Sequence, residues 1–268
     1  MTHDEQRKYL IQKLLDEDIH YKDVVIPTDV QQQKLLLRSL MNVRPPKAVS
    51  REFMEVQDNY LSDERDAAGV VDAASLPVVP QYPRLVLWQG DITVLNCDAI
   101  VNAANSQLCG CFRALHSCID NIVHTKAGIA LRLKCNEIMQ KQGREEPAGQ
   151  AKITPAYNLP GKYILHTVGP IIETGHPSEQ QKEQLASCYR SCLQLAAESG
   201  CKSIAFCCIS TGVFMFPNRE AAEIAIKTVK DVLAVDTRIE RVIFNVYKDL
   251  DKEIYEKLLA RIFTSDVV

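Results

Sequence analysis

A long apolar run and an excess of one charge are both missing from this chain of 268 residues. No apolar stretch approaches the roughly 18 to 20 residues that cross a bilayer, and the polar start of the chain lacks the apolar segment of a signal peptide. The 31 basic and 34 acidic residues give a net charge of -3, which provides no strong positive field for nucleic acid or an anionic membrane. The sequence therefore predicts a cytoplasmic protein with neither nucleic-acid nor membrane partners.

Two nucleotide-binding fingerprints are missing as well. The chain contains neither a Walker lysine loop nor the GxGxxG turn that opens the first helix of dinucleotide-binding folds. Because both motifs supply the backbone that cradles phosphate in their families, their absence argues against a P-loop ATPase and against a Rossmann dehydrogenase.

Cysteine, by contrast, is abundant, and ten of them would suggest a disulfide framework in a small secreted domain. Here they occur in a long chain with 46% apolar residues and no export signal, so disulfides are not expected. Cys188 and Cys192 share a helical stripe, while Cys207 and Cys208 lie in an apolar run, and a free thiol packs in such places as a small apolar group. The cysteines within residues 109–118 do not fit this pattern.

The N-terminal part of the chain is predicted to be helical. Leucine and isoleucine recur at helical spacing within residues 4–18 and 29–42, and a third helix is expected after Ser50. Residues 63–83 are rich in charge, small side chains and proline, which is typical of a connecting loop. We therefore expect a helical extension over residues 1–83.

From Arg84 onward, short apolar runs alternate with longer helical patterns. Strands are predicted at residues 84–89, 99–102, 151–156, 163–168, 203–209 and 241–246. Helices are predicted at residues 119–140, 178–198, 217–233 and 250–263. This alternation is typical of βαβ units, so the sequence predicts an α/β domain over residues 84–268 with a largely parallel sheet covered on both faces.

Polar loops follow several of these strands, at the edge where parallel sheets bind ligands. Asp91 follows the first strand, and the polar residues of segment 102–106 follow the second. In isolation each of these groups is most simply a turn. The segment 210–217 enters a helix, and its amides, with Gly212 allowing close approach, suit phosphate oxygens. An ordinary strand-to-helix turn is the alternative for that segment.

The loop after the second strand carries a possible metal site. Cys111, His116 and Cys118 provide three ligand types that zinc accepts, close enough in sequence to reach one ion. Three protein ligands with an open fourth position are typical of catalytic zinc, whereas a fourth ligand such as Cys109 would close a structural site. A redox-active or simply buried cysteine cluster is the alternative.

Five motifs in this chain have the order and spacing of those in a macrodomain, the ADP-ribose-binding module. They are GDIT at 90–93, DAIVNAANS at 98–106, IDNIVH at 119–124, HTVGP at 166–170 and STGVFMFP at 210–217. The resemblance covers about residues 84–265 and implies a three-layer α/β/α sandwich with a mixed, largely parallel sheet. The insert GCFRALHSC and the helical extension resemble the zinc-containing subclass of microbial protein-ADP-ribose hydrolases.

The resemblance assigns most of these loops to ADP-ribose. It implies that Asp91 accepts a hydrogen bond from the adenine amino group. It also implies that the diphosphate lies against the backbone amides of the segment 210–214 and of the loop that ends at Cys118 to Asp120. Phe214 would border the distal ribose, and Tyr247 would stack near the adenosine, although an aromatic side chain there is equally consistent with the core. The implied ADP-ribose-binding residues are Asp91, Ile92, Asn105, Cys118, Ile119, Asp120, Ser210, Thr211, Gly212, Val213, Phe214 and Tyr247.

Asn105 and Asp120 are the implied catalytic residues. Asn105 would hold ribose hydroxyls, and Asp120 would orient or deprotonate a water. An acidic residue in a first helical turn also stabilises the helix dipole, which is the structural alternative for Asp120. Two positions depart from the wider family: ligands of the metal replace a glycine-rich loop at 110–118, and Met215 stands where a second glycine is common.

The function implied by the resemblance is hydrolysis that removes ADP-ribose from mono-ADP-ribosylated protein side chains. Zn2+ on Cys111, His116 and Cys118 would polarise a ribose hydroxyl or a bound water. A reader that binds ADP-ribose without cleaving it, and an O-acetyl-ADP-ribose deacetylase, are the alternatives, because both use the same pocket. The motifs contact only the ADP-ribose part of a substrate, so they leave open both the amino-acid linkage and the oligomeric state.

Overall fold

The computed structural model describes residues 1–173 and 175–265, with side chains described through residue 260. Its main sheet contains β2 (Val78–Val79), β3 (Tyr82–Gln89), β5 (Ala99–Ala104), β6 (Ala151–Pro155), β7 (Tyr163–Val168), β8 (Ser203–Phe206) and β9 (Arg241–Val246). The strands lie in the order β2-β3-β9-β8-β5-β7-β6. Neighbouring strands from β3 to β7 pair in parallel, and the edge strands β2 and β6 are antiparallel. The expected mixed, largely parallel sheet is confirmed.

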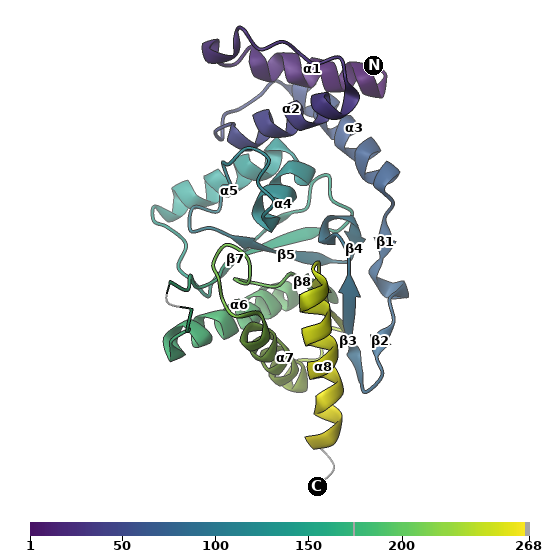
Figure 1. Ribbon diagram of the computed structural model, residues 1–268, viewed down its shortest axis with the longest axis vertical. Coiled ribbons are helices and arrows are strands. Elements are labelled where there is room, and N and C mark those ends of the chain that lie inside the picture. Colours follow the sequence, from purple (N-terminus) through teal and green to yellow (C-terminus); the bar gives the residue numbers. More distant parts are fainter. Residues whose placement is uncertain (174, 266–268) are drawn as a thin grey trace.

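Helices cover both faces of this sheet (Figure 1). One face carries α4 (Ile119–Ala127) and α5 (Ile129–Gln142), and the other carries α6 (Glu179–Glu198), α7 (Asn218–Val235) and α8 (Asp249–Ser265). The three-layer sandwich is therefore as predicted. Among the described residues, no helix combines the length and the apolar character that crossing a membrane requires.

The N-terminal extension folds as three helices with a small core of its own. They are α1 (His3–Leu15), α2 (Val30–Val43) and α3 (Arg51–Ala68), and they pack on one another at the end of the molecule beyond α4 and α5 (Figure 1). Leu10 and Ile11 are completely buried in this core, which also includes Ile129 of α5. The extension therefore shares apolar surface with the sheet domain, as short amphipathic helices require.

The segment between the extension and the sheet is more ordered than the sequence predicted. Residues 63–68, expected in a loop, belong to α3, which ends at Gly69 with a φ of 84°. Two short strands, β1 (Val71–Asp72) and β2, pair with β4 (Leu95–Asn96) and β3. Strand pairing to the domain thus begins before residue 83, and the division at that residue stays a prediction.

Two other predicted elements have different bounds. The helix expected over residues 119–140 is two helices, because Gly128, with a φ of 91°, breaks the backbone between α4 and α5. A Cβ atom at Gly128 would also come 2.7 Å from Nε2 of Gln57 on α3, so glycine allows the extension to pack closely here. The strand expected to reach residue 209 ends at Phe206, and the chain then enters the loop at the sheet edge.

The cysteines lie where their environments predicted. All ten are free thiols. Cys188, Cys192 and Cys207 are buried in the main core, and Cys208 packs against it. Cys111 and Cys118 are only half-buried, so they are distinct from this group.

Candidate functional site

The predicted ligand-binding loops meet at one edge of the sheet. Because β3, β9, β8 and β5 are adjacent and parallel, their carboxyl ends lie side by side. The loops that follow them contain, in the same order across the sheet, Asp91, Tyr247, the segment 210–217 and Asn105. The predicted ligand-binding groups, from four separate stretches of sequence, therefore line one continuous edge.

Asp91 lies at this edge, shortly after β3, and is the N-cap residue of a short 3-10 helix, Ile92–Val94. Its Oδ1 accepts hydrogen bonds from the backbone N of Thr93 at 2.9 Å and from Oγ1 of Thr93 at 2.6 Å. The carboxylate thus caps a turn, as the simpler interpretation proposed, but the side chain is exposed and its Oδ2 has no hydrogen-bond partner among the described residues. Ile92 is buried and anchors the turn. Asp91 can cap the turn and still accept a bond from a ligand.

The loop after β8 presents backbone donors. Met215 N bonds to Gly212 O, and Phe216 N bonds to Ser210 O, whereas the amides of residues 212–214 make no hydrogen bond with the described part of the chain. Oγ of Ser210 is buried and also lacks a partner there. Ser210 and Met215 have φ values of 64° and 58°, a conformation that costs L residues energy and is often found in functional loops. Such a cluster of free donors suits an anion.

Tyr247 and Phe214 lie on the surface of this edge rather than in the core. The side chain of Tyr247 is 77% exposed, directly after β9. Phe214 is half-buried, and its carbonyl accepts a hydrogen bond from Ile172 N at 2.8 Å. The core alternative for Tyr247 is therefore wrong, while its stacking on adenosine stays a prediction.

Asn105 and Asp120 are brought together although they are separated by fifteen positions in the sequence. Nδ2 of Asn105 donates to Gly110 O at 3.1 Å and lies 3.4 Å from Oδ2 of Asp120. Asp120 is 4% exposed, and burial raises the pKa of its carboxyl to about 6, partly offset by a hydrogen bond from Asn102. The two predicted catalytic residues thus form one contact at the start of α4.

A buried polar network beneath this contact was not predicted from the sequence. Nδ2 of Asn102, on β5, donates to Oδ1 of Asp120 at 2.8 Å and lies 3.2 Å from Nδ1 of His166, on β7. Nε2 of His166 is 3.0 Å from Oγ1 of Thr154. Burial lowers the pKa of His166 to about 3, so its imidazole is neutral. The motifs around Asn102 and His166 indicated function, but strand residues are difficult to assign to a site before the pairing of β5 with β7 is known.

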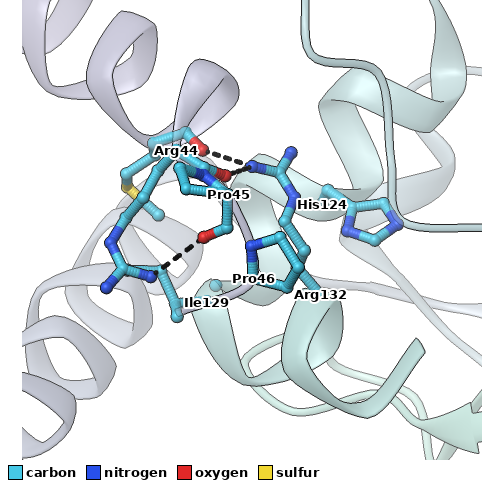
Figure 2. A pocket seen from close by; sticks show the side chains of 8 residues that line it. Arg44, Pro45, Pro46, His124, Ile129 and Arg132 are labelled. Carbon is cyan, nitrogen blue, oxygen red and sulfur yellow. Dashed lines mark hydrogen bonds between the residues drawn. The ribbon is translucent and has the colours of Figure 1, made fainter. Parts of the chain in front are cut away.

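His124 lies next to this network and also faces the extension. Its Nε2 is 3.7 Å from Oδ1 of Asp120, and neither ring nitrogen has a hydrogen-bond partner among the described residues. His124, Arg44, Pro45 and Arg132 are among the residues that line a cavity of about 10 Å³ (Figure 2). This volume is close to the minimum that a single water needs.

The predicted metal ligands converge. The ligand atoms of Cys111, His116 and Cys118 all lie within 4.8 Å of one another, and the three residues are half-buried. Sγ of Cys111 is 3.4 Å from Nδ1 of His116. In a tetrahedral zinc site, bond lengths of about 2.3 Å to sulfur and 2.1 Å to nitrogen separate these atoms by about 3.6 Å, so the spacing fits. Cys109 is not part of this group; its carbonyl instead accepts a hydrogen bond from Arg132.

The backbone around these ligands is held by Asn121. Its Nδ2 donates to Arg113 O at 2.9 Å and to Cys111 O at 3.3 Å, and its backbone N donates to Sγ of Cys118 at 3.4 Å. Burial raises the pKa of the Cys118 thiol, and the adjacent Cys111 thiol raises it further. Cys118 is also the N-cap of α4, which places the ligands at the start of the helix that carries Asp120.

A second group of side chains could also hold a metal ion. His124, Cys135 and His166 bring their ligand atoms within 4.8 Å of one another, and all three are buried. Burial raises the pKa of the Cys135 thiol and lowers those of both histidines, so the group is uncharged as it stands. An ion there would be sealed from substrate, whereas Cys111, His116 and Cys118 are half-exposed at the sheet edge. This group has no local sequence signature, because its members lie on three separate elements, α4, α5 and β7.

Comparisons with known proteins agree with this arrangement. The Macro domain family model matches residues 101–225. A protein-ADP-ribose hydrolase of Treponema medium is 53% identical over 262 residues, spanning 97% of this chain and 100% of that protein. One from Staphylococcus aureus strain MRSA252 is 48% identical over 254 residues, spanning 95% of each chain.

Solved structures of similar fold contain the expected ligand. A mutant macrodomain of Oceanobacillus iheyensis with ADPR has a TM-score of 0.62 and 36% identity, covering 68% of this chain and 94% of that one. The Trypanosoma brucei macrodomain in complex with ADP-ribose has a TM-score of 0.65 and 29% identity, covering 83% and 94%.

Proposed function

Because the chain belongs to the macrodomain family of protein-ADP-ribose hydrolases, we propose that it releases ADP-ribose from mono-ADP-ribosylated protein side chains at a zinc-containing site. One observation carries this proposal. Asn105 and Asp120, which stand at the two ends of the ligand-bearing loop, meet at 3.4 Å, so the metal ligands and the two catalytic candidates belong to one small region. A purely structural metal would not need that proximity.

ADP-ribose would lie along the sheet edge from Asp91 to Asn105. The free Oδ2 of Asp91 is a suitable acceptor for the adenine amino group, and the backbone of Ile92 would contact the ring. The diphosphate would be held by amides of Ser210, Thr211, Gly212, Val213 and Phe214 and by the start of α4 at Cys118, Ile119 and Asp120. Unpaired amides at 212–214, the orphaned hydroxyl of Ser210 and the positive end of the α4 dipole support this placement.

The distal ribose would then reach the contact between Asn105 and Asp120. Oδ1 of Asn105 already accepts a hydrogen bond from Gln107 N at 3.0 Å, and its second lone pair is free to accept one from a ribose hydroxyl. Asp120 fixes the amide of Asn105 from the other side and can orient a water toward the anomeric carbon. The two residues thereby position the reacting groups. In the best-oriented reactions, such positioning lowers the activation free energy by about 7 kcal/mol or more.

Zinc fits the ligand-bearing loop because two cysteines and one histidine provide its preferred donors at suitable spacing and leave a position open. Cys111, His116 and Cys118 would hold the ion, which would supply Lewis-acid chemistry. The chain's own residues would hold the loop against α4 through Asn121 and would place the nucleotide through the loops described above.

Release of free ADP-ribose from a panel of proteins, each modified through a known serine, carboxylate or arginine linkage, tests the proposal. We expect release from at least one member, measured by mass spectrometry of the nucleotide. Tight binding of ADP-ribose without release from any member would indicate a reader instead. Acetate release from O-acetyl-ADP-ribose, with every modified protein left intact, would indicate a deacetylase.

A further inference from the structure

Helix α2 of the extension makes direct hydrogen bonds to the segment 109–118, called here the metal loop. Nη2 of Arg38 donates to His116 O at 2.8 Å and to Oδ1 of Asn121 at 3.0 Å. Oδ1 of Asn42 accepts from Leu115 N at 3.0 Å, and Asn42 is only 1% exposed. Two neighbouring residues of the metal loop are therefore tied to a helix that precedes the sheet domain in the sequence.

The same end of α2 is joined to the beginning of the metal loop through Arg132 of α5. Its guanidinium donates to the carbonyls of Met41 and Asn42, at 2.9 and 3.0 Å, and to Cys109 O at 2.8 Å. The last carbonyls of a helix have no partner within the helix, so Arg132 satisfies groups that otherwise require water. Figure 2 shows the guanidinium of Arg132 pointing toward Arg44, at the end of α2, whose carbonyl also accepts a hydrogen bond from it.

The metal loop contains little internal structure, and the contacts that the side chains of Asn105 and Asn121 of the sheet domain make with it end at the carbonyl of Arg113. Its segment 112–115 is exposed, and its one backbone hydrogen bond between described loop residues joins His116 N to Arg113 O at 3.3 Å. Leu115 has a φ of 55°, a conformation that is unfavourable for leucine and that the surroundings must stabilise. The bond from Leu115 N to Asn42 provides that stabilisation from outside the loop.

We propose that α2 is a positioning element for the metal site, with Arg38 and Asn42 as the positioning residues that fix His116 relative to Cys111 and Cys118. This inference rests on the proposed function, in which the metal loop binds zinc. Groups that orient metal ligands without touching the ion typically contribute about 10- to 100-fold in metal affinity. The extension would thus be a part of the metal site, because it contacts Leu115 and His116 in addition to the contacts that Asn121 makes from α4.

Two substitutions in the full chain test this role. Asn42→Ala removes the acceptor for Leu115 N, and Arg38→Met removes the donor to His116 O while keeping an apolar stem of similar length. Thr125→Val is the matched control, because it removes the 2.8 Å bond between Asn42 and α4, together with the bond from Oγ1 of Thr125 to Asn121 O inside that helix, and leaves the bond from Asn42 to the metal loop intact. Arg38→Lys keeps a donor for the His116 carbonyl and serves as the conservative variant.

The measurements are zinc affinity, by competition with a chromophoric chelator, and the absorption spectrum of the Co2+-substituted protein, whose thiolate and ligand-field bands report coordination geometry. Asn42→Ala and Arg38→Met should each weaken zinc binding by about tenfold or more and alter the Co2+ bands. Thr125→Val should match the wild type in both, even if it lowers the melting temperature, and Arg38→Lys should recover part of the lost affinity.

Wild-type zinc affinity and an unchanged Co2+ spectrum in both Asn42→Ala and Arg38→Met would overturn the positioning role while leaving the proposed function standing. An equal loss in Thr125→Val would also overturn it, because general loosening of the seam between α2 and α4 would then explain the effect. A wild-type protein that takes up neither Zn2+ nor Co2+ would contradict the proposed function itself, and the positioning role with it.

Discussion

Nδ2 of Asn102 donates a hydrogen bond to Oδ1 of Asp120, 2.8 Å away, at a point where both side chains are almost fully buried. The bond links the end of β5 to the first turn of α4, on either side of the metal loop. A buried carboxylate is costly unless it accepts hydrogen bonds, so this bond offsets part of the cost of burying Asp120.

Replacing Asn102 with alanine should therefore destabilise the protein by about 1.5 to 3 kcal/mol, the range for a hydrogen bond to a charged group. Denaturant unfolding of the free protein measures this change. Asn245→Ala is a suitable comparison, because Asn245 is similarly buried and donates to a neutral carbonyl, Gly90 O, at 2.9 Å. Asn245→Ala should lower the free energy of unfolding by less, about 0.5 to 1.5 kcal/mol. A larger decrease in Asn245→Ala than in Asn102→Ala would contradict this explanation.

Asp91→Ala should weaken ADP-ribose binding by about 1 to 3 kcal/mol and leave the zinc content unchanged, because Asp91 would bond the adenine far from the metal loop. Calorimetric titration with ADP-ribose measures the affinity. The chain offers a matched control in Asp72, which caps another 3-10 helix, Ala73–Ser75, by accepting from Ala74 N at 3.0 Å. Asp72→Ala should lose cap stability but keep full ADP-ribose affinity, and equal affinities for both variants would remove Asp91 from the adenine role.

Acid should remove the contribution that the Asp98 carboxylate, just before β5, makes to the free energy of unfolding. Burial alone would raise the pKa of Asp98, but hydrogen bonds from Lys162, Lys202 N and Ser203 outweigh it and hold the pKa below the usual 3.8. A depressed folded-state pKa contributes stability above the unfolded value, and that stability is lost as the pH falls through the folded value. Asp98→Asn should thus cost at least about 1 kcal/mol at pH 7.

The difference between Asp98→Asn and the wild type should shrink below about pH 4, as the wild-type carboxyl becomes protonated. Urea unfolding at a series of pH values measures this. A difference that stays constant down to about pH 2 would show that Asp98 acts through packing and not through its charge.

Gly128→Ala should destabilise the seam between the extension and the sheet domain. The new Cβ would both strain a backbone with a φ of 91° and collide with Gln57 on α3. Gly143 provides the control, because it also has a positive φ, 68°, but a Cβ atom there would meet nothing within 4 Å. We expect Gly143→Ala to lower the free energy of unfolding by about 1 kcal/mol, and Gly128→Ala to lower it by about 1 to 3 kcal/mol more. Faster amide exchange in α3 for Gly128→Ala alone would locate the effect, and equal costs would argue against close packing there.

Local patterns in the sequence predicted most of the sheet and the ligand loops. Alternating apolar runs and helical stripes located the main strands and helices, because they report which face of each element is buried. The break at Gly128 was missed, since apolar periodicity continues on both sides of it. Two-residue strands such as β1 and β2 carry too few side chains to show a period. Each of these errors concerns an element whose bounds depend on packing with a distant segment.

The residues of the site also divide into those that a local pattern predicted and those that depend on packing with a distant segment. Cys111, His116 and Cys118 share one loop, so their spacing alone indicated a metal site. Beside the local contacts of Asn121, this loop is held by Arg38, 78 positions before His116, and by Asn42, 73 positions before Leu115. No local pattern reports such long-range pairs, because neither residue type is unusual on a helix surface.

Zinc held by Cys111, His116 and Cys118 should be required for hydrolysis, and the variant His116→Ala tests this requirement. The measurement is ADP-ribose release from a modified protein that the wild type processes, with zinc content determined on the same samples and Cys109→Ala as the matched control, since the Cys109 side chain lies outside the ligand group. We expect the His116→Ala protein to lose zinc and hydrolysis but still bind free ADP-ribose, while Cys109→Ala retains all three. Full hydrolytic activity in a verified zinc-free His116→Ala protein would contradict it.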